Sequence, residues 1–187
     1  MNVEVLQTVR GTTIDGPLLI TPRAFGDDRG WFFESWNQTR FNDAVGQTVE
    51  FSQDNHSRSI QGVLRGLHYQ RGEYAQAKLV RVVKGAVQDV VVDVRPGSKT
   101  YGQFFSIELS EENKTQLFIP RGLAHGFLAL EDTTVFSYKC DNFYNKEAEL
   151  GIVFNDKDLK ITWNSLDNDF IVSEKDQKLP KFRTIDL

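Results

Sequence analysis

Short runs of apolar residues recur along the whole chain, broken by Gly, Pro, Asn and Asp. Most runs are rich in Val, Ile, Phe and Tyr, which suit a pleated, half-buried strand. The predicted strands span residues 18–21, 30–36, 63–70, 78–83, 86–94, 103–109, 115–119, 126–130, 134–141, 151–154 and 159–163. Many short strands without alternating long helices are typical of antiparallel sandwiches and barrels, so the pattern predicts an all-β jelly roll.

The clearest strand pair is predicted over residues 78–94, where Gly85 supplies the turn of a hairpin. In its second strand valines alternate with Asp89 and Asp93. Because side chains alternate between the two faces of a strand, this pattern predicts one face in the core and one polar face.

Helical signals are few. Residues 37–44 predict a short helix capped by Asn37, and residues 173–177 predict a single turn. Pro180 prevents that turn from extending.

The length and composition indicate one core-forming domain. The chain has 187 residues, of which 40% are hydrophobic, and its net charge is −4. A mildly acidic chain is a poor candidate for non-specific nucleic-acid binding, and no apolar run is long enough to span a membrane. Cys140 is the single cysteine, so no intrachain disulfide is possible. Together with the absence of a signal-peptide pattern near Met1, this favours a cytoplasmic protein.

The chain contains 3 histidines, and two of them stand in unusual segments. His68 ends a Gly-x5-His segment, and His125 ends a Pro-x-Gly-x2-His segment. This spacing resembles the two short motifs of the cupin barrels. Metal-binding cupins place a second His where this chain has Gln70. We therefore expect a cupin-like barrel whose metal site is absent.

His68 alone is most simply interpreted as a core histidine bonded to a carbonyl, but the polar groups around it favour an anion-lined pocket. Arg65 and His68 are three positions apart, so a regular strand would point them to opposite faces. Gly66 lies between them and can carry a bulge. The sequence therefore predicts an irregularity near Gly66 that brings both side chains into one pocket.

Several ordered segments together resemble the dTDP-4-dehydrorhamnose 3,5-epimerase family. They include residues 25–34, 53–57, 62–70, 117–127, 149–151 and 173–176, and the match runs from about residue 22 to 180. The resemblance implies a cupin jelly roll with no metal and no other cofactor, with few short helices and with arms at both ends, usually a homodimer. It implies a single domain over residues 1–187 with a core at about 22–164. Residues 165–187 would pack back onto the site.

The resemblance also assigns roles to residues. His68 would be the base, Asp176 its orienting partner, Tyr138 the acid and Lys78 the cation near the developing oxyanion. Glu174 stays open as an alternative to Asp176. The residues implied in substrate binding, some of them across the dimer, are Arg29, Glu34, Gln53, Asn55, Arg65, His125 and Tyr144.

The function so implied is epimerisation at C3 and C5 of dTDP-4-dehydro-6-deoxy-D-glucose in dTDP-L-rhamnose biosynthesis. The alternatives are a mono-epimerase acting at C3 or C5 only, and a nucleotide-sugar binding protein without activity. A metal-dependent cupin oxygenase is disfavoured by Gln70.

Overall fold

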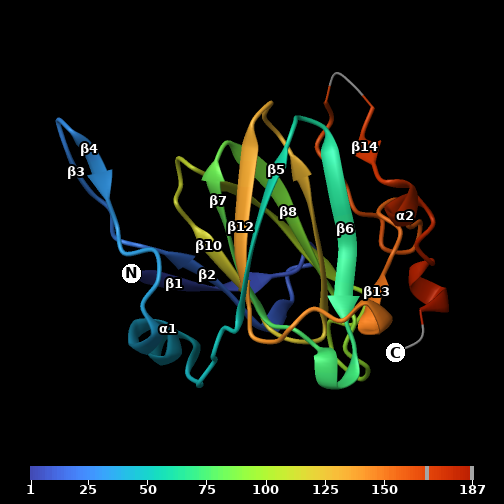
Figure 1. The fold of residues 1–187 in the computed structure, drawn as a ribbon. Helices are drawn as coiled ribbons and strands as arrows, with labels where there is room; N and C mark the ends of the chain where they lie inside the picture. The colour runs from blue at the N-terminus through green and yellow to red at the C-terminus, as the bar shows by residue number, and fades with distance from the viewer. Residues whose placement is uncertain (167–168, 186–187) are drawn as a thin grey trace.

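The computed structural model describes residues 1–166 and 169–185, which form two antiparallel sheets that face one another (Figure 1). The first sheet consists, in spatial order, of β1 (Asn2–Gln7), β2 (Thr13–Thr21), β10 (Gln116–Ile119), β7 (Lys78–Lys84), β12 (Thr134–Cys140) and β5 (Gln53–Ser59). The second consists of β13 (Glu149–Gly151), β6 (Val63–Gln70), β11 (Leu123–Ala129), β8 (Ala86–Asp93) and β9 (Phe104–Ser110), with β14 (Ile171–Val172) parallel to β6. The fold class is the predicted all-β, cupin-like jelly roll.

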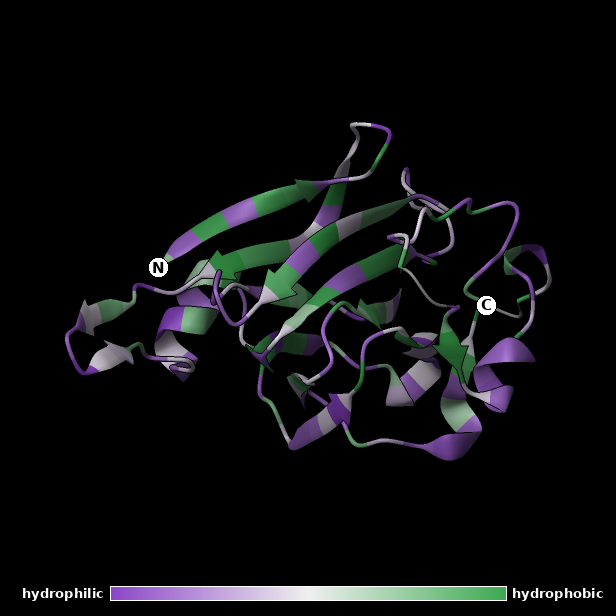
Figure 2. Cartoon of the chain, turned by 90° about the horizontal axis from the view of Figure 1, so that it is seen from above, coloured by the Kyte–Doolittle hydropathy of each residue, from purple (hydrophilic) through white to green (hydrophobic). Residues whose placement is uncertain are grey.

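The remaining elements are short. The helices are α1 (Gln38–Val45) and α2 (Glu174–Gln177), with 3₁₀ turns at η1 (Gly72–Tyr74), η2 (Lys146–Ala148) and η3 (Phe182–Thr184). The Asn37 side chain caps α1 as predicted, and the Ser173 side chain caps α2. The hairpin β3 (Phe25–Asp27) and β4 (Gly30–Phe32) projects away from both sheets in the two views (Figures 1 and 2).

The predicted hairpin over residues 78–94 is wrong. β7 pairs with β10 and β12, whereas β8 pairs with β11 and β9, so the two strands lie in different sheets. Gly85 has a φ of +76°, and a Cβ there would lie 2.7 Å from the Thr133 carbonyl oxygen. It is therefore the corner at which the chain crosses between sheets.

The predicted polar face of β8 is also wrong, because every residue of β8 is buried. One face, with Val87 and Val91, packs in the core cluster between the sheets. The other face, with Val90 and Val92, packs in a second cluster that includes Leu159 and the partly buried Trp163 and Phe182. The chain after β13 therefore covers the outer face of the second sheet, and residues 159–163 contain no strand.

Asp93 is a fully buried carboxylate at the end of β8, 0% exposed. Its oxygens accept hydrogen bonds from the Arg95 guanidinium and from the hydroxyls of Ser98 and Thr100. Burial works to raise the pKa of Asp93, but these hydrogen bonds outweigh it and lower that pKa to about 2. The carboxylate therefore ties the loop after β8 to the sheet.

Asp93→Asn is expected to lower the free energy of unfolding at pH 7 by about 2 kcal/mol or more. Because the folded-state pKa lies below the unfolded value, this contribution is complete above about pH 4 and is lost as the pH falls toward 2. Urea unfolding of both proteins between pH 7 and pH 3 checks this. An unfolding free-energy difference that stays constant across that range would contradict it.

Candidate active site

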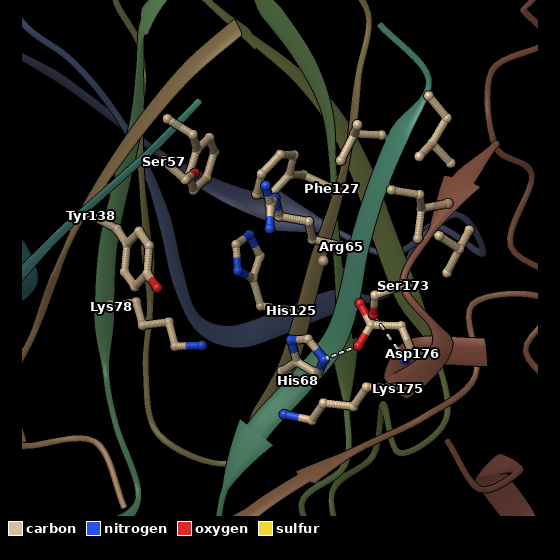
Figure 3. Close-up of a pocket in the computed structure, with 16 residues that line it drawn as sticks. Ser57, Arg65, His68, Lys78, His125, Phe127, Tyr138, Ser173, Lys175 and Asp176 are labelled. Carbon is tan, nitrogen blue, oxygen red and sulfur yellow. Dashed lines mark hydrogen bonds and ion pairs between the residues drawn. The ribbon is translucent and has the colours of Figure 1, made fainter. Parts of the chain in front are cut away.

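A cavity of about 590 Å³ opens between the two sheets. Side chains from β6 and β11 line it on one side and side chains from β5, β7 and β12 on the other. The segment from β14 to α2 closes it with Ser173, Lys175 and Asp176 (Figure 3). A second cavity of about 230 Å³ shares His68, Lys78 and Tyr138 with the first, so the two lie side by side.

A bulge in β6 places both Arg65 and His68 in this cavity. Arg65 pairs with Phe127 and His68 with His125, so three steps along β6 oppose two along β11. Gly66 between them has a φ of +114°, and a Cβ there would lie 2.6 Å from Gly126 Cα. Only glycine fits this close approach. Arg65 and His68 consequently both line the cavity, which confirms the predicted irregularity.

His68 is held by a carboxylate from the C-terminal segment. Its Nε2 lies 2.8 Å from Asp176 Oδ1, and the Gly66 N–H donates to Asp176 Oδ2 at 3.2 Å. Burial works to raise the pKa of Asp176, but the hydrogen bonds and charges of its neighbours together lower it. Of the two carboxylates considered, Asp176 contacts His68, while the exposed Glu174 pairs with Lys178.

An ionised carboxylate only accepts hydrogen bonds, so Nε2 of His68 carries the hydrogen. The unprotonated Nδ1 is then directed into the cavity, where Figure 3 shows the free side of the ring. This arrangement suits a general base whose tautomer is fixed by an aspartate.

Tyr138 lies across the cavity from His68, on β12 of the opposite sheet (Figure 3). Burial, together with the nearby Cys140 and Glu149, raises the pKa of Tyr138, and the charge of Arg65 offsets this in part. The hydroxyl therefore keeps its proton at neutral pH. Among the described residues, none forms a hydrogen bond with it, which leaves it available to a ligand.

Lys78 extends from β7 into the cavity between these two groups (Figure 3). Burial lowers the pKa of Lys78, and the nearby Cys140, Asp89 and Glu149 oppose that shift. Arg65 donates from Nε to Ser59 Oγ at 3.2 Å, which leaves its two terminal nitrogens for another partner. The cavity thus combines a carboxylate-held imidazole, a protonated phenol and two basic side chains.

The second cavity contains three of the residues expected to bind a nucleotide: Gln53, Asn55 and Tyr144. The Tyr144 hydroxyl donates to Glu149 Oε2 at 2.7 Å, and Lys175 forms an ion pair with the same oxygen. No site role was predicted for Glu149 or Lys175, although both stand in the segments that carry the resemblance.

Arg29 and Glu34 lie apart from the other predicted site residues of this chain. Arg29 lies on the projecting β3–β4 hairpin, where its side chain is 89% exposed and pairs with Asp27. Glu34 pairs with Arg40 near α1. Neither lines the cavity that contains His68.

Metal ligands do not gather in the part of the chain that the structure describes: no group of three or more His, Cys, Asp or Glu there is placed to hold an ion. In the same residues, no helix is long and apolar enough to cross a membrane.

Comparison with known proteins gives consistent matches. Residues 11–184 match the family described as dTDP-4-dehydrorhamnose 3,5-epimerase. The enzyme of that name from Escherichia coli (strain K12) is 52% identical over 168 residues, which cover 90% of this chain and 90% of that protein.

Solved structures agree. The dTDP-6-deoxy-D-glucose-3,5-epimerase from Legionella pneumophila, in complex with dTDP-4-keto-L-rhamnose, has a TM-score of 0.90 and 43% identity and covers 99% of this chain and 95% of its own. A 3'-monoepimerase from Streptomyces bikiniensis, in complex with dTDP-quinovose, has a TM-score of 0.87 and 32% identity, covering 96% of this chain and 88% of its own.

Proposed function

The chain belongs to the dTDP-4-dehydrorhamnose 3,5-epimerase family, and we propose that it inverts C3 and C5 of dTDP-4-dehydro-6-deoxy-D-glucose in this cavity. The product is dTDP-4-dehydro-L-rhamnose, the precursor of dTDP-L-rhamnose. The observation that carries the proposal is the His68–Asp176 pair on one wall with Tyr138 on the other.

The chemistry follows from the C4 ketone, which acidifies the protons at C3 and C5. His68 Nδ1 removes one of these protons, and the resulting enolate places negative charge on the C4 oxygen. Lys78 stabilises that charge. Tyr138 then donates its proton to the opposite face of the same carbon. Each inversion leaves a proton on His68 and removes one from Tyr138. Proton exchange with solvent then restores the neutral imidazole and the protonated phenol for the next inversion.

The shape of the two cavities suits such a substrate. In a pyranose ring C1 and C4 stand at opposite ends, so the diphosphate at C1 and the ketone at C4 point in opposite directions. The nucleotide would occupy the cavity with Gln53, Asn55 and Tyr144, and the ketone end would reach His68, Lys78 and Tyr138. Arg65 and His125 would contact the sugar or the phosphates.

The decisive experiment is incubation of the protein with dTDP-4-dehydro-6-deoxy-D-glucose in D2O, with the sugar followed by NMR. Deuterium at both C3 and C5 with an L-rhamno product supports the proposal. Deuterium at one carbon indicates a mono-epimerase, the activity named for the Streptomyces bikiniensis relative. Tight binding without deuterium at either carbon indicates a binding protein.

The exposed hairpin supports a homodimer in which each protomer completes its partner's site. Phe25, Trp31 and Phe32 are largely exposed on it, although side chains of this kind are normally covered. Arg29 stands at its tip, remote from the cavity of its own chain. In this arrangement Arg29 and Glu34 would contact the nucleotide in the partner's cavity.

We place the dimer in the cytoplasm, where the buried Cys140 thiol stays reduced.

Mixing two variants tests this arrangement. His68→Asn lacks the base and Arg29→Ala lacks the hairpin contact, so each alone is expected to be weakly active. After random subunit exchange, about half of the dimers contain one intact site, which restores about a quarter of wild-type activity. If Arg29 acted in its own chain's site, the mixture would gain nothing over the separate variants.

A further inference from the structure

A second histidine–aspartate pair lies in the wall of the catalytic cavity. His125 Nε2 on β11 is 2.8 Å from Asp89 Oδ2 on β8, the adjacent strand. His125 lines the cavity and is 8% exposed, whereas Asp89 is 0% exposed and does not line it. Among the residues that line the cavity, Asp89 is hydrogen-bonded to His125, and its charge also acts on Lys78.

Asp89 differs sharply from Asp93, which stands four residues later on the same face of β8. Both carboxylates are fully buried. The oxygens of Asp93 accept hydrogen bonds from Arg95, Ser98 and Thr100. In the described part of the chain, by contrast, no donor contacts Asp89 Oδ1. An under-satisfied buried carboxylate costs folding free energy, so stability does not account for Asp89.

The hydrogen bond to Asp89 determines which ring nitrogen of His125 is free to contact a ligand. The carboxylate accepts, so Nε2 carries the hydrogen, and Nδ1 is the nitrogen left to meet a ligand. In Figure 3 the ring lies among Tyr138, Lys78, His68 and Arg65, with its free nitrogen on the side of Tyr138 and Lys78. Lys78 and Arg65 only donate hydrogen bonds, and Tyr138 is the proposed acid. Besides the base His68, His125 thus offers a ring-nitrogen acceptor on this wall of the cavity.

We propose that Asp89 is a positioning residue that fixes the Nε2–H tautomer of His125, so that Nδ1 accepts a hydrogen bond from the sugar hydroxyl at C3. This inference rests on the proposed function. The hydroxyl at C3 is attached to a carbon that is inverted, so holding its oxygen determines which face of C3 turns toward His68. Asp89 acts on the reaction without touching the substrate.

Asp89→Asn tests the proposal because an amide of the same shape donates where the carboxylate accepts. Its N–H would bond to Nε2, and the ring hydrogen would move to Nδ1, which then donates into the cavity. We expect deuterium incorporation at C3 to fall about ten- to a hundredfold with a raised KM. The melting temperature should stay unchanged or rise, because a buried charge is removed.

Asp93→Asn is the matched control: the same substitution on the same strand. It should lower the melting temperature and leave the exchange rate at C3 unchanged per folded molecule. A purely structural role for Asp89 predicts that Asp89→Asn behaves in the same way. Loss of melting temperature with wild-type exchange at C3 in Asp89→Asn would therefore overturn the proposal.

Heteronuclear NMR of the histidine rings in the wild-type protein provides a test that needs no turnover and no variant of Asp89. The ring of His125 is assigned by its absence from the spectrum of His125→Asn. A hydrogen on Nε2 alone supports the proposal, and a hydrogen on Nδ1 overturns it. If the wild-type protein exchanges neither C3 nor C5, the proposed function fails, and the tautomer still decides the role of Asp89.

Discussion

His68→Asn is expected to lower deuterium incorporation at both C3 and C5 by about 10²- to 10⁴-fold while the protein stays folded. The asparagine amide cannot accept a proton from carbon, and His125, the other carboxylate-held histidine on this wall, is the residue proposed to hold the C3 hydroxyl. The side chain of His68 is partly exposed in the cavity, so its replacement removes little core packing. Sugar NMR in D2O and thermal unfolding of both proteins give the two readouts.

Two further variants make the assignment specific. Asp176→Asn keeps the shape of the pair, but its amide would donate to Nε2 and force the ring hydrogen onto Nδ1, where the lone pair is needed. A loss on the order of 10³- to 10⁴-fold is expected. His56→Asn changes an exposed histidine on β5 that lines neither cavity, and should have no effect. Wild-type turnover in folded His68→Asn would assign the base to another residue.

Much of the site could be predicted because its constraints are local in sequence. Gly66 between Arg65 and His68 signals a bulge, since two side chains three positions apart share a pocket only if the strand is irregular. The capping serine at position 173 predicts the turn that carries Asp176. The contact of that turn with β6, more than a hundred residues earlier, came from the family resemblance, because no local pattern reports it.

The failures have physical causes. β5 is missing from the predicted strands because its inward positions, Gln53, Asn55 and Ser57, face the cavity and are polar like its outward positions. A strand whose inward side chains line a polar cavity therefore lacks the alternation of apolar and polar residues by which strands are recognised. Gly85 suits a hairpin turn and a corner between sheets equally well. The residues of the turn therefore do not predict whether β8 pairs with β7 or lies in the other sheet.

The interpretation of Asp89 and Asp93 failed for a related reason. Asp is normally a surface residue, so alternation with valine indicates a polar face. Here the loop after β8 satisfies Asp93, and His125 contacts Asp89. Both partners lie outside the strand, and a pattern within the strand contains no information about them.

Tyr138→Phe is expected to separate proton removal from inversion. The variant keeps His68, Asp176 and Lys78, so the base still removes a proton and the cation still stabilises the enolate. Without the hydroxyl, the proton returns from the His68 side and the original configuration is restored. Deuterium incorporation with retention should persist, while formation of the inverted product falls about 10²- to 10⁴-fold.

Stability should not change in this variant by more than about 0.5 kcal/mol, because no described residue hydrogen-bonds the Tyr138 hydroxyl and the ring is kept. Tyr144→Phe is the control: it removes a hydroxyl that bonds to Glu149 near the nucleotide cavity, so it should raise KM and leave the ratio of exchange to inversion unchanged. Wild-type inversion in Tyr138→Phe would show that another group delivers the second proton. Loss of exchange together with inversion would place Tyr138 in proton removal, on the same side of the reaction as His68.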